Sequence, residues 1–149
     1  MQMHKILVLK SLNDNKNEKL QTAFLLEQTA NKINSDYFKA KAYNSIGAYY
    51  FMEGSQAEMP KGSEFISKAY NLAQKINDKN LTNEISSNYS LLKVKQGLYA
   101  DAIKMNDEVA QYYLSKKDFS GAQNSYNNLA FVFYLQKDYK NAITQFEQS

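Results

Sequence analysis

Apolar residues recur at helical intervals in three stretches of the chain, and each stretch follows a residue that commonly starts a helix. These starting residues, Ser35, Asp78 and Asp118, come at nearly equal intervals. Their side chains are of the type that accepts a hydrogen bond from a backbone N–H of the first helical turn. Apolar residues spaced by three and four positions follow each of them. The pattern predicts helices over about residues 36–53, 79–96 and 119–136.

A small residue recurs in register on these helices, as Gly47, Ser90 and Ala130. A small side chain at that point allows a second, returning helix to approach closely. We therefore expect each predicted helix to be paired with the helix that follows it. Before residue 35, another returning helix is outlined by Leu20, Phe24, Leu25 and Ile33.

Short turns separate the members of each expected pair. Gly97 is able to take the left-handed conformation that ends a helix, and Lys137-Asp138-Tyr139 makes the equivalent turn in the next unit. The first repeat departs from this plan by three inserted residues within 54–61, where Pro60 fits the first turn of the next helix. We expect a single elongated domain of a partial pair over 1–34 and repeats over 35–77, 78–117 and 118–149.

The third unit carries a recognisable set of residues in order. They are Asn128-Leu129-Ala130, Phe133-Tyr134, Gln136, Asp138-Tyr139, Ala142-Ile143 and Phe146. In this order and spacing the unit resembles the tetratricopeptide repeat family, a stack of antiparallel helix pairs. The second unit keeps Tyr99 and Ala102-Ile103 but has Lys93 in place of Phe133 and Asn106 in place of Phe146.

The usual period of this family is about 34 residues. The intervals from Ser35 to Asp78 and from Asp78 to Asp118 are both longer than that. In this respect the chain is similar to kinesin light chains and to bacterial peptide-sensing regulators. The resemblance implies an all-α fold, a right-handed α-solenoid of antiparallel helix hairpins, and binding of a protein or peptide in its concave groove.

In each helix pair, a stripe on the side of the first helix that faces away from its small residue is expected to line that groove. Asparagine amides suit the backbone of a bound peptide, lysines suit a carboxylate, and aromatic rings suit an apolar side chain. The alternative is that these residues only solvate helix surfaces in a chain rich in Asn and Lys. The candidate ligand-binding residues are Lys41, Asn44, Asn88, Leu91, Lys95, Asn124, Asn127, Asn128, Phe131 and Tyr134.

Composition excludes several kinds of site. The chain has no Cys and no Arg, and its one histidine, His4, is expected at the surface. Without thiolates, further imidazoles or a nucleophile beside a base, we expect no metal, no cofactor and no catalytic activity. The absence of Arg and the presence of Glu84 on the same stripe also argue against the two-carboxylate clamp by which some family members bind chaperone tails.

Charge and hydropathy limit the partners further. The net charge is +3, with lysines interleaved among acidic residues, so we expect no nucleic-acid partner. The apolar run at 6–9 is too short to span a membrane or to act as a signal peptide. It is expected to be a truncated helix of a protein that resides in the cytoplasm.

Two functional hypotheses follow from this pattern. The first is a noncatalytic scaffold that binds a protein or peptide. The alternative is the sensory or oligomerisation region of a bacterial signalling or transcriptional regulator whose output domain is absent. The chain stops inside a returning helix, so it is expected to be a fragment, with self-association through Ile143 and Phe146.

Overall fold

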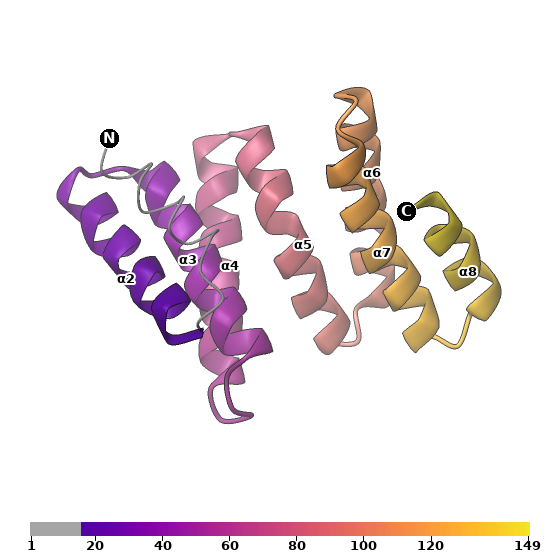
Figure 1. Cartoon of the computed structure of the whole chain (residues 1–149), viewed down its shortest axis with the longest axis horizontal. Helices are drawn as coiled ribbons and strands as arrows, with labels where there is room; N and C mark the ends of the chain where they lie inside the picture. The colour runs from indigo at the N-terminus through magenta and orange to yellow at the C-terminus, as the bar shows by residue number, and fades with distance from the viewer. Residues whose placement is uncertain (1–15) are drawn as a thin grey trace. The chain divides into compact units, whose positions relative to one another are not determined.

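The computed structural model describes residues 16–149, which form seven α-helices and no strand (Figure 1). The all-α class is therefore confirmed. His4 and the truncated helix expected at 6–9 lie outside the described residues. The helices are α2 (Lys16–Lys32), α3 (Asp36–Met52), α4 (Met59–Ile76), α5 (Lys79–Lys95), α6 (Tyr99–Ser115), α7 (Phe119–Leu135) and α8 (Tyr139–Gln148).

The three predicted helix starts are confirmed by hydrogen bonds that the capping side chains accept from backbone N–H groups. Asp78 Oδ1 accepts from the backbone N–H of Leu81 at 2.9 Å, and Asp118 Oδ1 accepts from that of Gly121 at 2.9 Å. Ser35 Oγ accepts from the backbone N–H of Phe38 at 3.5 Å. Each cap satisfies an N–H that has no partner inside its helix. The helices that follow end within one residue of the predicted positions.

The turn at Gly97 shows how one helix ends and the next begins. Gly97 has φ +76°, which confirms the predicted left-handed conformation. Its N–H donates to the carbonyl of Val94 at 2.9 Å, and the N–H of Leu98 donates to that of Lys93 at 2.9 Å. These are the two bonds of a Schellman motif, which satisfies the last carbonyls of a helix. One residue after Leu98, α6 begins.

This turn recurs at a constant interval. Asn77, Gly97, Lys117 and Lys137 all have positive φ and are equally spaced along the chain. From α5 to α7 the helices have 17 residues each, and three residues connect each to the next. The repeat seen in the sequence is therefore two equal helices with two equal turns. Asn34 has the same conformation before α3, but the insertion after α3 makes the first repeat longer.

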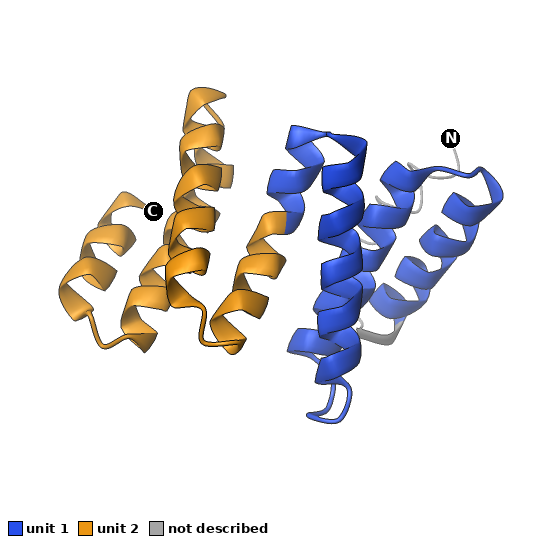
Figure 2. Cartoon of the chain, turned by 180° about the vertical axis from the view of Figure 1, so that it is seen from behind, with its two compact units in different colours: residues 1–85 blue, residues 86–149 orange. Residues whose placement is uncertain are grey.

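The chain divides into two compact units, residues 1–85 and 86–149, and the division falls within α5 (Figure 2). In the first unit α2 packs on α3, and α3 packs on α4. Of the residues predicted to outline α2, Leu20 and Phe24 pack against a cluster that contains Ile46, whereas Leu25 and Ile33 are exposed. A second cluster of the first unit contains Ala40, Ala69, Ala73, Leu81 and Ile85.

The close approach predicted from the small residues is confirmed between α3 and α4. A Cβ added to Gly47 would lie 2.7 Å from the backbone nitrogen of Ile66, and one added to Gly62 would lie 2.5 Å from that of Phe51. Contacts this short leave no room for a side chain. Pro60 stands in the first turn of α4, as predicted.

In the second unit the equivalent small residues are also buried. Ser90 of α5 and Ala130 of α7 have no exposed surface. Val94, Ala102 and Val132 form one cluster that joins α5, α6 and α7. Together with the packing of α7 on α8, this cluster gives the second unit a core that follows the helices in sequence order.

Candidate functional site

The predicted ligand-binding residues fall in both compact units. Lys41 and Asn44 lie on α3 in the first unit. The remaining eight belong to the second unit, three on α5 and five on α7. They are Asn88, Leu91, Lys95, Asn124, Asn127, Asn128, Phe131 and Tyr134.

Lys41 already meets a carboxylate of its own chain. Its Nζ lies 2.9 Å from Oε2 of Glu84, and 5.5 Å from the ring centroid of Tyr37. Its side chain is only 19% exposed. Burial lowers the pKa of Lys41, but the hydrogen bond and charge of Glu84, helped by Tyr37, outweigh burial and raise that pKa above its ordinary value of 10.5. Lys41 is therefore charged at neutral pH, and a partner's carboxylate would compete with Glu84 for it.

Three more of the predicted residues also interact within the chain. Asn44, Asn88 and Lys95 each make at least one polar, ring or electrostatic contact of their own. Asn44, Asn88 and Leu91 are half-buried, whereas Lys95 is exposed. Binding through Asn44, Asn88 or Lys95 would require a ligand to share or replace existing contacts.

The predicted residues on α7 form the more accessible set. Asn124 and Asn127 are exposed, and Phe131 and Tyr134 are 44% and 56% exposed. Only Asn128 is half-buried. The spacing by three and four places the exposed residues along one side of the helix. The buried residues of α7 are Ala122, Ser125, Leu129, Ala130 and Val132.

This side of α7 joins two kinds of group, side-chain amides and aromatic rings. The amides of Asn124 and Asn127 both donate and accept hydrogen bonds, which is what a peptide backbone requires. The rings of Phe131 and Tyr134 continue the stripe toward the end of the helix and offer apolar area. Such a surface is suited to binding a peptide segment with at least one apolar side chain.

The sequence reasoning missed a pocket of about 490 Å³ in the first unit. It lies between α3 and α4, where Tyr43 and Leu72 line it beside three lysines, Lys39, Lys68 and Lys75. Its position depends on how the two helices meet, which the repeat register does not describe.

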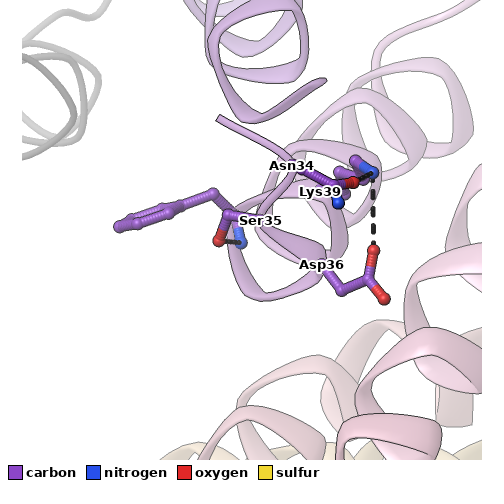
Figure 3. Close-up of polar contacts among 5 residues, drawn as sticks. Asn34, Ser35, Asp36 and Lys39 are labelled. Carbon is purple, nitrogen blue, oxygen red and sulfur yellow. Dashed lines mark hydrogen bonds and ion pairs between the residues drawn. The ribbon is translucent and has the colours of Figure 1, made fainter. Parts of the chain in front are cut away.

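The lysines of this pocket are already neutralised in large part. Lys39 Nζ lies 3.4 Å from Oδ1 of Asp36 and 3.3 Å from Oδ1 of Asn34 (Figure 3). Lys68 pairs with Glu64, whose hydrogen bond raises the pKa of Lys68. The pocket therefore has no large excess of positive charge with which to hold an anion.

Neither a metal cluster nor a membrane-spanning helix occurs in the described part of the chain. Residues 16–149 contain no group of three or more His, Cys, Asp or Glu residues arranged to hold a metal ion. Within the same residues, no helix combines the length and the apolar character needed to cross a membrane. Comparisons of the chain with protein-family models, with curated proteins and with solved structures found no match.

Proposed function

We propose that the chain is a noncatalytic scaffold that binds a peptide segment of a partner protein through the exposed side of α7. The observation that carries this proposal is the exposure of Asn124, Asn127, Phe131 and Tyr134 along one side of a helix whose other side is buried. Both rings are partly exposed, and that of Tyr134 also contacts the ring of Tyr139 edge-on, with 5.9 Å between ring centroids. Exposed aromatic rings next to adaptable amides are a common composition for recognition surfaces.

The proposed architecture is a right-handed solenoid of antiparallel helix hairpins of the tetratricopeptide repeat kind. Its support is the constant interval between left-handed turn residues and the capping Asp that follows three of them. Equal helices joined by equal turns present the same side of each first helix in succession. Within the second unit, a bound segment would then run along α7 and the part of α5 that belongs to the same unit, with α7 supplying the most accessible part.

In the proposed complex the amides and the rings have separate tasks. Asn124 and Asn127 pair with N–H and C=O groups of the segment, which fixes its position without reading its side chains. Phe131 and Tyr134 surround one apolar side chain, which provides most of the affinity. Lys95, exposed at the end of α5 in the same unit, favours an acidic residue in the ligand.

The proposal is tested by selecting peptides from a random displayed library on the intact chain and measuring their binding to variants. Phe131→Ala and Asn127→Ala are each expected to weaken the selected peptides by about tenfold or more, the loss typical of a central contact. Gln111→Ala, at an exposed position of α6, is the matched control and should leave binding unchanged. Peptides that bind all three variants as tightly as the original chain would show that α7 is not the site.

A second candidate function is the sensory or oligomerisation region of a bacterial signalling or transcriptional regulator. The observation that favours it is the exposed apolar side chains of α8, Ile143 and Phe146, which suit contact with another chain or domain. The reading frame that encodes the chain tests this candidate. An adjoining kinase or DNA-binding domain would support it, and a frame with no such domain would exclude it.

A further inference from the structure

The exposed side of α8 is a continuous apolar stripe. Tyr139, Ile143 and Phe146 are 55%, 57% and 53% exposed, and their spacing of four and three residues places them on one side of the helix. Ala142 is 3% exposed and lies on the side that packs against α7. The helix therefore buries a small residue and leaves three large ones more than half exposed, of which Tyr139 also contacts the ring of Tyr134 edge-on.

The same positions are covered one repeat earlier. There α6 carries Tyr99, Ile103 and Asn106 at the places of the three stripe residues. Asn106 is buried, and the other two are half-buried against a cluster that includes Val132 of α7. In α6, where the described chain provides a neighbouring helix, the equivalent surface is therefore covered.

Two charges flank the stripe of α8 and have no partner within the described part of the chain. Lys140 and Glu147 are exposed and stand two helical turns apart, on the same side as Ile143. No ion pair to either is formed within residues 16–149. A Lys in the first turn and a Glu in the last are each disfavoured by the helix dipole. The stability of α8 alone does not explain this arrangement.

We propose that α8 is a self-complementary interface at which a second copy of this chain packs its own α8 antiparallel, about a two-fold axis. In heptad terms Ile143 occupies an a position, and Tyr139 and Phe146 occupy d positions. Lys140 and Glu147 are then both e positions, which face each other across an antiparallel pair. Each Lys140 meets the partner's Glu147, and two equal ion pairs close the interface.

The charge order is what selects this partner over others. An unrelated apolar helix would cover the stripe but would match Lys140 and Glu147 only by chance. A copy of α8 running in the opposite direction matches both at once. A helix of ten residues buries a small area, so the dimer is expected to be weak, reversible and sensitive to salt. This inference does not rest on peptide binding by α7.

Charge reversal tests the interface in the full chain by sedimentation equilibrium over a range of concentrations at low salt. Lys140→Glu and Glu147→Lys alone should each raise the dimer dissociation constant by about tenfold or more, because each places two like-charge contacts across the two-fold axis. The double variant Lys140→Glu/Glu147→Lys should return it to within about threefold of the original. Each single change improves the fit to the dipole of α8, so loss of the dimer cannot be assigned to unfolding.

Two further variants make the result decisive. Ile143→Asp should abolish the dimer, whereas Lys75→Glu, at an exposed position of α4, should leave it unchanged. A chain that stays monomeric at millimolar concentration would overturn the proposal. So would a dimer that tolerates both single reversals, since it would use another surface, and a double variant that fails to recover would overturn the antiparallel geometry.

Discussion

The hydroxyl of Ser90 lies 3.2 Å from Oδ1 of Asn106, and both residues are buried where α5 meets α6. Asn106 Nδ2 donates to the carbonyl of Ala102 at 2.9 Å, and Ser90 shares its hydrogen with the carbonyl of Ser87 at 2.8 Å. In the next repeat, Ala130 stands at the position of Ser90 and Phe146 at that of Asn106. One repeat therefore joins its two helices through a polar contact where the next has apolar residues.

Ser90→Ala is expected to destabilise the chain by about 1–3 kcal/mol, because it leaves the buried Asn106 Oδ1 without a partner. Adding Asn106→Leu should recover most of that loss, since replacing both members by apolar groups removes the unsatisfied oxygen. Urea unfolding of the single and double variants measures both effects. A double variant less stable than Ser90→Ala would show that the polar pair is needed for packing as well as for hydrogen bonding.

Gly97 and Lys137 occupy equivalent turn positions, and substitutions at the two should change stability in opposite directions. Gly97→Ala should cost about 1 kcal/mol, because an alanine is strained at positive φ. No atom lies within 4 Å of the added Cβ, so the cost is conformational and not steric. Lys137→Gly should instead stabilise by up to about 1 kcal/mol, since Lys137 holds φ 61°. Thermal unfolding monitored by circular dichroism would measure both, and equal signs would contradict a conformational origin.

Leu98 is the one residue in the series of equivalent turn positions from Asp78 to Asp138 that supplies no side-chain cap. Leu98→Asp is expected to stabilise α6 by about 1 kcal/mol, because an Asp at this position accepts a first-turn N–H. Leu98→Ala is the control for removing the apolar side chain. If the two variants have the same free energy of unfolding, the capping bond does not form.

Gly47→Ala should destabilise the chain by about 1–3 kcal/mol through the forced separation of α3 and α4. The added Cβ would lie 2.7 Å from the backbone nitrogen of Ile66 and 3.0 Å from the carbonyl oxygen of Gly62, and backbone atoms cannot turn aside. The better helix propensity of Ala, worth about 1 kcal/mol, offsets only part of this. Denaturant unfolding would show the loss, and an increase in stability would mean that the helices separate easily.

The Lys41–Glu84 pair is expected to show a coupling of about 0.5–1 kcal/mol in a double-mutant cycle of Lys41→Met and Glu84→Gln, because one partner is half exposed. The pKa of Lys41 is raised in the folded chain. Its contribution to stability is therefore fully present below about pH 10.5 and is lost as pH rises through the higher folded value. Cycles measured at about pH 7 and about pH 9 should agree, and a coupling that falls between them would contradict the raised pKa.

Much of the local structure was predictable because it depends on residues close together in sequence. Ser35, Asp78 and Asp118 marked helix starts, and Gly97 marked a left-handed turn. Lys117 and Lys137 hold the same conformation without being glycine, so only their regular spacing from Gly97 could have identified them.

The candidate site was less predictable because it depends on contacts between helices. Glu84 was placed on the same stripe as Lys41, but nothing in the sequence sets the 2.9 Å approach of the two side chains. Asn106 looked like a simple departure from the repeat, since its partner Ser90 lies on another helix. The exposed rings of Phe131 and Tyr134 were expected from the periodicity of α7 alone.

The constant interval between turns also bears on how such a chain changes in length during evolution. One whole repeat consists of two helices with their turns. From α5 onward, duplicating or deleting one whole repeat at any turn would keep every later helix next to the same type of neighbour. A change of half a repeat would exchange the two types of helix. The three extra residues after α3 show that single turns also tolerate growth. From α5 onward, a change of one whole repeat is therefore expected to preserve helix packing better than a change of half a repeat.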